Sequence, residues 1–302
     1  AIRRGPMKTP ESGTEVFATA TATGYPRYIS NFPVDMFFQQ TISGGDTSIA
    51  SRLTGSQYLS TNLTNAESTS AAYIFDSMIG AGSNNTNSNL YGRLFRRAPS
   101  FMDVVAYTGT GSARTVAHNL GVAPELIIVK DRTSGAFGWP VYVASLGVSS
   151  AVFLNSNIAV LGGVSYWDSS SPTASNFLLG GVTSVNQSND NYVAYLFATL
   201  AGVSKVGSYT GTAADINIDC GFSSGARFVL IKRTDSTGDW YVWDSARGIV
   251  SGNDPYLLLN STAAENTSTD YIDPLASGFT VTSSAPAALN ASGGNYIFLA
   301  IA

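Results

Sequence analysis

Few residues of this chain have the chemistry of a catalytic or metal-binding centre. His118 is the only histidine and Cys220 the only cysteine among the 302 residues. Any Ser-His-Asp or Cys-His mechanism would therefore use His118, near Asp131 or Ser112, and no nucleophile-elbow string accompanies it. One histidine and one cysteine are too few for a transition-metal cage. We predict that His118 is a turn residue bonded to the backbone, with no metal and no cofactor.

Carboxylates offer a second chemistry, because glycoside hydrolysis uses a pair of Asp or Glu side chains. The candidates among the 20 acidic residues are Asp168, Asp190, Asp239, Asp244, Glu265, Asp270 and Asp273. None of them recurs as a pair in the repeated segments described below. Oxygen ligands for Ca²⁺ occur around Asp235, Asp239 and Asp244, without the spacing of an EF-hand. The sequence thus identifies no catalytic residues and predicts a protein that is not an enzyme.

Aromatic side chains are the best candidates for ligand binding, since sugars stack their C–H faces on such rings. Trp139 and Trp240 occupy one repeated position, which is typical of core packing. Trp167 lies in a segment that is not repeated, and Tyr241 and Trp243 follow Trp240. We therefore predict Trp167, Tyr241 and Trp243 as ligand-binding residues, with host-surface polysaccharide as the candidate ligand.

The charge of the chain argues against nucleic acid as a partner. Charged residues make up 12%, and the formal net charge is −4. The one basic cluster is Arg93, Arg96 and Arg97. It fits an anion site or, by our preferred interpretation, a strand end or an interface where guanidinium groups pair with carboxylates. No apolar run approaches the roughly 18 residues of a membrane span.

Five short blocks occur twice in the same order. The string Tyr107-Thr108-Gly109-Thr110 returns as Tyr209-Thr210-Gly211-Thr212. The other matches are 124–130 with 226–232, Trp139 with Trp240, 153–156 with 258–261, and 191–198 with 295–302. A weaker, shortened copy precedes them, from 33–40 to 89–96, with Thr47 in place of the tryptophan. Such ordered similarity indicates three tandem modules.

The apolar residues of each module come in short runs such as 126–129, 192–197 and 228–231. These runs are rich in β-branched and aromatic residues and end at Gly, Asn, Asp or Ser, as buried strands do. We expect an all-β chain of tandem antiparallel β-sandwich modules of jelly-roll-like type. The predicted parts are an N-terminal arm at 1–15, an abbreviated module at 16–99, and full modules at 100–202 and 203–302.

The string 101–110, Phe-Met-Asp-Val-Val-Ala-Tyr-Thr-Gly-Thr, is followed by His-Asn-Leu-Gly-Val-Ala-Pro-Glu-Leu-Ile-Ile-Val-Lys at 118–130. Together they resemble a repeat module of unassigned function in structural proteins of tailed phages, particularly marine and cyanobacterial ones. The closing block 192–198 is similar too. The resemblance is strong over 101–202, fair over 203–302 and weak before that. The last copy lacks the His-Asn-Leu-Gly string and has Asp219-Cys220-Gly221 nearby.

The resemblance implies a structural protein of a virion appendage, such as a tail fibre or head fibre, and supplies no catalytic residue. We expect an extracellular, virion-located protein that contacts other virion proteins. Low charge and many aromatic residues favour association, with a homotrimer as the expected form, because soluble monomers rarely expose large apolar patches. The alternatives are a glycan-cleaving tail depolymerase and a cellular surface adhesin.

Overall fold

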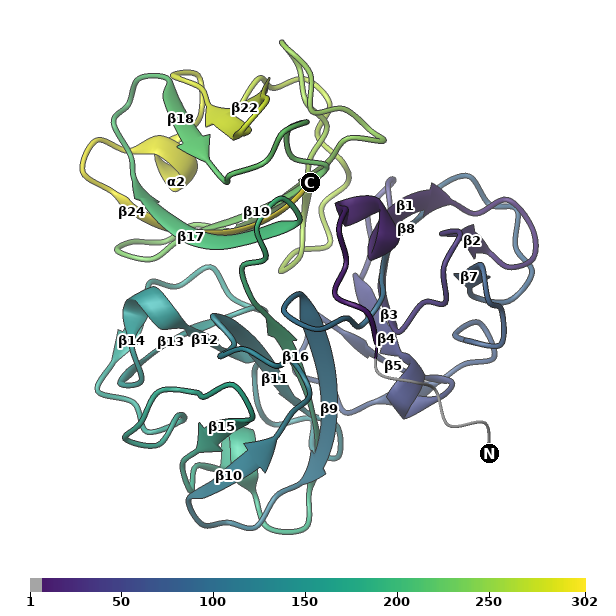
Figure 1. Cartoon of the computed structure of the whole chain (residues 1–302), viewed down its shortest axis with the longest axis vertical. Helices are drawn as coiled ribbons and strands as arrows, with labels where there is room; N and C mark the ends of the chain where they lie inside the picture. The colour runs from purple at the N-terminus through teal and green to yellow at the C-terminus, as the bar shows by residue number, and fades with distance from the viewer. Residues whose placement is uncertain (1–6) are drawn as a thin grey trace.

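The strands of the chain fall into three units that share one topology (Figure 1). The computed structural model describes residues 7–302, so the first part of the predicted arm at 1–15 lies outside the described residues. Within them, β1 to β8 form unit 1, β9 to β16 form unit 2 and β17 to β24 form unit 3. Strands n, n+8 and n+16 correspond, except that β22 is not the counterpart of β6 and β14.

Unit 1 contains η1 (Gly13–Glu15), β1 (Phe17–Thr21), β2 (Tyr28–Ile29), β3 (Met36–Thr41), β4 (Ser48–Ser51), η2 (Arg52–Thr54), β5 (Gln57–Ser60), β6 (Ser68–Thr69), β7 (Gly80–Ala81) and β8 (Leu90–Phe95). Unit 2 contains β9 (Met102–Thr108), β10 (Arg114–Ala117), β11 (Leu126–Asp131), β12 (Pro140–Val143), η3 (Ala144–Leu146), β13 (Ser150–Phe153), β14 (Leu161–Gly162), β15 (Asn176–Leu179), α1 (Thr183–Asn186) and β16 (Asn191–Phe197). Unit 3 contains β17 (Ser204–Thr210), β18 (Ile216–Asp219), β19 (Phe228–Arg233), β20 (Trp240–Asp244), β21 (Leu257–Leu258), β22 (Ile272–Leu275), β23 (Gly278–Val281), α2 (Ala287–Asn290) and β24 (Asn295–Ile301). None of these helices is long and apolar enough to cross a membrane.

Each unit has a large and a small antiparallel sheet. The large sheets run β1-β8-β3-β4-β5-β6, β9-β16-β11-β12-β13-β14 and β17-β24-β19-β20-β21. The small sheets are β2-β7, β10-β15 and β18-β23-β22. The sixth strand extends the large sheet in units 1 and 2; in unit 3 a single bridge between Tyr256 and Asn266 takes its place, and β22 is an additional strand of the small sheet. The predicted all-β, antiparallel sandwich architecture is confirmed.

The large sheets are apolar on both faces. In β11, Ile127 and Val129 face a core inside unit 2, whereas Leu126 and Ile128 face the centre of the molecule. This alternation follows from the two-residue period of a strand. A strand buried on both faces needs an unbroken apolar run, which is what the sequence has at this place.

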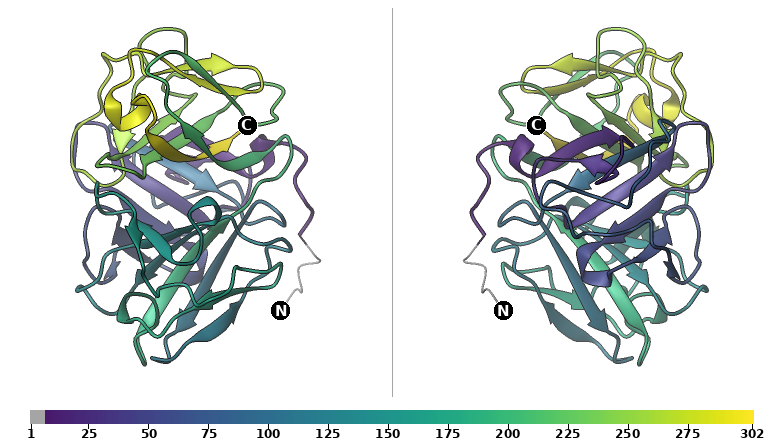
Figure 2. Two further views of the ribbon diagram at one scale, coloured as in Figure 1. Left: turned by 90° about the vertical axis from the view of Figure 1, so that its left-hand side faces the viewer. Right: turned by 90° about the vertical axis from the view of Figure 1, so that its right-hand side faces the viewer.

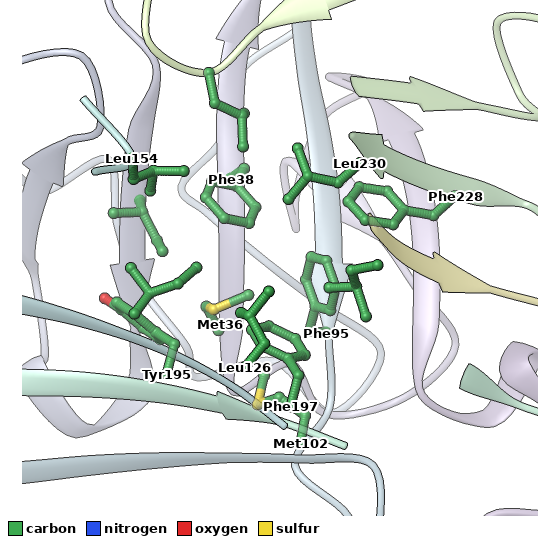
Figure 3. Packing of buried hydrophobic residues seen from close by; sticks show 14 of the residues in the cluster. Met36, Phe38, Phe95, Met102, Leu126, Leu154, Tyr195, Phe197, Phe228 and Leu230 are labelled. Atoms are coloured by element: carbon green, nitrogen blue, oxygen red, sulfur yellow. The ribbon is translucent and has the colours of Figure 1, made fainter. Parts of the chain in front are cut away.

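The inner faces of the three large sheets meet in one common core (Figure 3). Phe95 of unit 1 lies at its middle, with ring centroids 6.0 Å from Phe197 of unit 2 and 5.9 Å from Phe228 of unit 3. The side views in Figure 2 show the units packed closely against one another. The units are therefore parts of one body with a shared hydrophobic centre.

The units close into a ring through three corresponding boundaries, which we call seams. One backbone hydrogen bond marks the same point of each seam: Glu67 N to Arg132 O (3.0 Å), Val160 N to Thr234 O (2.8 Å) and Glu265 N to Ile42 O (2.9 Å). These bonds join unit 1 to 2, unit 2 to 3 and unit 3 to 1. The last of them closes the ring.

Trp139 and Trp240 lie at the seams and are fully buried, as the repeat predicted. The indole nitrogen of Trp139 donates to Leu63 O across the seam between units 1 and 2, at 2.9 Å. That of Trp240 donates to Phe153 O across the next seam, at 2.8 Å. The repeated tryptophans thus fill the core and satisfy a carbonyl of the preceding unit.

A buried lysine or glutamine crosses each seam from the fifth residue of β3, β11 or β19. Lys130 Nζ donates to Thr64 O at 2.8 Å. Lys232 Nζ donates to Asn157 O at 3.2 Å and Ile158 O at 2.9 Å, and to two carbonyls of its own unit. Gln40 Nε2 reaches Leu258 O at 3.2 Å. Each side chain supplies donors to backbone carbonyls of the adjoining unit.

We expect Lys232→Met to lower the free energy of unfolding by about 3 kcal/mol, because four backbone carbonyls, among them that of the buried Gly238, lose their donor. Lys232→Gln is the matched control, since Gln40 fills the corresponding position in unit 1. Lys232→Gln should lower the free energy of unfolding clearly less than Lys232→Met does. Urea unfolding followed by tryptophan fluorescence measures both, and equal losses in the two variants would contradict the role of Lys232.

Candidate functional site

Trp167 is buried, contrary to what a stacking platform for sugars requires. Its side chain is 3% exposed, and its indole nitrogen donates to Ser150 O at 3.1 Å. Its ring packs edge-on against Tyr142, with centroids 5.7 Å apart. The residue still lines a pocket of about 380 Å³ together with Asp168 and Ser169. Trp167 therefore forms a wall of this pocket and presents no open ring face.

Tyr241 and Trp243 lie together in β20 of unit 3, apart from Trp167 in unit 2. Their rings are stacked at 5.8 Å and are 8% and 0% exposed. Both belong to the core between the large and small sheets of unit 3. The outer layer covers all three predicted ligand-binding rings, because large apolar rings are efficient core fillers.

Trp167→Ala should therefore lower the stability of the protein by about 3–5 kcal/mol, the usual cost of removing a buried tryptophan side chain. Tyr25→Ala, at an aromatic residue that is 58% exposed, is the control and should have little effect. Chemical denaturation followed by circular dichroism compares the two. An unchanged unfolding midpoint for Trp167→Ala would mean that its ring is not part of the core.

His118 is bonded to the backbone through both ring nitrogens. Nε2 lies 3.1 Å from Thr173 O, and Nδ1 accepts from Leu120 N at 3.2 Å. Burial lowers the pKa of the imidazole, which favours the neutral form that donates from Nε2. Asp131, a considered partner, accepts instead from Thr133 N at 2.8 Å. The predicted turn role of His118 is confirmed.

The basic cluster forms interfaces between units. Arg93 and Asp244 pair at 3.2 Å across the seam between units 1 and 3, and both are completely buried. Arg97 pairs with Asp103 of unit 2. These two ion pairs confirm the interface interpretation of the cluster.

Asp244 was a candidate carboxylate for catalysis, and the structure corrects this. Tyr91 donates to one carboxylate oxygen at 2.7 Å, and Arg247 approaches the other at 3.1 Å. Burial alone would raise the pKa of Asp244, but Arg93 and Arg247 hold it below its ordinary value. With no exposed surface, this carboxylate balances the buried guanidinium groups and has no access to a substrate.

The carboxylates that do meet at a surface hollow belong to the outer layer of unit 3. A pocket of about 470 Å³ has a mostly polar wall formed by Asp215, Asn217, Ser251, Asp273, Pro274 and Thr280. Asp215 accepts from Ser283 N at 2.7 Å, and this bond lowers the pKa of its carboxyl. We call this hollow the acidic pocket.

Asp254 is fully buried and interacts electrostatically with Asp273, which lines the acidic pocket. One carboxylate oxygen accepts from Val250 N at 2.7 Å, and the other has no partner. Burial, with the charges of Asp270 and Asp273, raises the pKa of Asp254 to about 7. Sequence reasoning missed Asp254, because only the fold places it beside Asp270 and Asp273.

No group of three or more His, Cys, Asp or Glu residues in the described part of the chain is arranged to hold a metal ion. Asp215 and Asp273 are the carboxylates that line the acidic pocket.

The stability of the protein should fall as the pH rises from about 4 to about 7, because folded Asp254 keeps a proton that the unfolded chain releases. Asp254→Asn removes this dependence while keeping the oxygen that accepts from Val250. Relative to wild type, the variant should gain roughly 4 kcal/mol more at pH 8 than at pH 4. Thermal unfolding across this range tests it, with the exposed Asp219→Asn as control. A parallel pH profile for wild type and Asp254→Asn would show that Asp254 titrates normally.

Comparison with known proteins places the chain in a family. The comparison with curated proteins found no match. A family described as a domain of unknown function, DUF7483, matches residues 40–302. This range covers units 2 and 3 completely and unit 1 from the end of β3 onward. Since the match takes in most of the sequence and all three seams, the chain belongs to the DUF7483 family.

Proposed function

We propose that the protein is a structural component of a phage virion appendage, such as a tail fibre or head fibre, which binds host-surface glycan without cleaving it. The observation that carries the proposal is the closed ring of three units around one core. A chain whose units share their hydrophobic centre has no hinge between them, so it suits a part of a particle that must keep its shape.

The chemistry of the side chains supports binding rather than catalysis. His118 uses both ring nitrogens for backbone contacts, and Asp244 is enclosed by guanidinium groups. Hydroxyl and amide side chains, by contrast, abound on a chain that is only 12% charged. Such groups exchange hydrogen bonds with sugar hydroxyls. The resemblance of 101–130 to modules of tailed phages supports the location on a virion.

Contacts with other virion proteins, and assembly into a homotrimer, are part of this proposal. Four of the large apolar side chains that are exposed lie close to β2 and β7 of unit 1: Tyr25, Ile29, Met78 and Ile79. Solvent-exposed apolar groups that gather in one place are typical of interaction surfaces. The short small sheet of unit 1 therefore provides a contact area.

A glycan-cleaving enzyme is the second candidate, and the acidic pocket is the observation that favours it. The pocket lies in unit 3, where Asp254 has a raised pKa. Cleavage would require a protonated carboxyl on one side of the glycosidic bond and an ionised one on the other. Asp215 and Asp273 line the hollow, whereas Asp254 is fully buried and could act on a substrate only through them.

The two functions differ in products. Incubated with polysaccharide from the surface of the host, the protein should release no new reducing ends above buffer, while sedimenting with the insoluble polysaccharide. Peptides of the chain should also be found by mass spectrometry in virions purified on a density gradient. Sustained release of oligosaccharides that is lost in Asp273→Asn, with Asp219→Asn as the active control, would favour the enzyme instead. Absence of the chain from purified virions would contradict the proposed location.

A further inference from the structure

The three seams share a backbone bond but differ in the side chains around it. At the seam between units 1 and 2, the bond joins Glu67 to Arg132, and their side chains form an ion pair at 2.7 Å. Arg132 also donates to Gln57 at 2.7 Å. An arginine thus bridges the two units and occupies the space beside the backbone bond.

At the seam between units 2 and 3, short side chains stand in the same two places. The bond from Val160 N to Thr234 O is 2.8 Å long, so the backbones remain joined. Valine and threonine cannot form the ion pair that the corresponding residues form at the first seam. A pocket of about 520 Å³ lies beside them, which we call the seam pocket. Its wall consists of Ser145, Leu146, Val160, Ser208, Tyr209, Thr210, Thr234, Asp235, Asn295, Tyr296 and Ile297.

The seam pocket combines an apolar surface with fixed polar groups. Leu146, Val160 and Ile297 contribute aliphatic atoms, from both units. Tyr209 is stacked on Tyr296 with centroids 4.8 Å apart. The hydroxyls of both tyrosines are tied to backbone carbonyls, so the rings are held in place.

Asp235 supplies an ionised acceptor at the rim. Arg233 donates to its two oxygens at 3.0 and 3.1 Å and lowers the pKa of this carboxyl to about 2. Its Oδ1 also accepts from Asn295 N at 3.0 Å, which fixes its position. Because the guanidinium group of Arg233 balances the charge of Asp235, the rim offers hydrogen-bond acceptors but attracts cations only weakly. An anionic ligand would be disfavoured, because it would lie beside this carboxylate on a chain of net charge −4.

We propose that the seam pocket binds a neutral sugar residue of a glycan. Aliphatic atoms of Leu146 and Val160 next to hydroxyl, amide and carboxylate groups match a pyranose, which has C–H faces and a rim of hydroxyls. The volume lies in the range of about 300–1,000 Å³ that is usual for small-molecule sites. The inference rests on the glycan attachment proposed above and assigns it to one site.

The chain itself provides the design of the test. Val160→Glu with Thr234→Arg copies the ion pair of the first seam into the second, and should fill the pocket. The reverse exchange, Glu67→Val with Arg132→Thr, alters the first seam and leaves the seam pocket intact. Ser208→Trp, at an exposed residue of the rim, fills the pocket without touching the seam, in case the double variant does not fold.

The probe is a printed array of neutral glycans ending in glucose, galactose, mannose or N-acetylglucosamine, with sialylated and sulfated glycans beside them. Isothermal titration calorimetry then follows the strongest neutral oligosaccharide. Wild type and the first-seam variant should bind it alike, and both pocket-filling changes should weaken binding at least tenfold. No binding to neutral glycans, a preference for the acidic ones, or unchanged binding by folded Ser208→Trp would overturn the proposal. Because detection of the chain in virions is independent of this array, failure of the sugar site and failure of the virion role are separate results.

Discussion

The constraint on which the structure depends is that each large sheet is apolar on both faces. A sheet of this kind is stable in water only if something covers each side. The small sheet and loops of the same unit cover one side. The other side is covered by the two neighbouring units, which bring Phe95, Phe197 and Phe228 into one centre. No unit can therefore complete its own burial, and the fold is cooperative across the whole chain.

Apolar packing alone would not determine which unit neighbours which. The three seams, however, have different side chains at equivalent positions. Arg93 of unit 1 faces Asp244 of unit 3. At the seam between units 1 and 2, the equivalent residues are Tyr195 of unit 2 and Ser51 of unit 1, which interact through a hydrogen bond. The third pair of places holds the apolar residues Leu299 and Val143. A unit in the wrong neighbourhood would bury an arginine without a carboxylate, which costs several kcal/mol. Specific pairing of this kind keeps a pseudo-symmetric ring in one arrangement.

The strands and the burial of Trp139 and Trp240 could be predicted from the sequence, because repeated blocks and short apolar runs mark the positions of strands. The burial of Trp167, Tyr241 and Trp243 under the outer layer could not, since a strand pattern does not say which residues a distant loop will cover. The raised pKa of Asp254 could not be predicted for a similar reason, because only the course of the loops in unit 3 brings it near Asp270 and Asp273. The seam pocket could not be predicted either. It depends on the short side chains of Val160 and Thr234, whose equivalence to Glu67 and Arg132 follows only from the strand register.

Closure of the ring has an evolutionary consequence. In each unit the first strand pairs with the last, as β9 with β16 and β17 with β24, so a unit begins and ends at neighbouring points. A segment with that property can be copied in tandem with a short joint and without refolding its neighbours. Three copies, however, use up every seam, and a fourth would find no free edge of the core. Further change in such a chain therefore falls on the side chains at the seams, where the three copies already differ.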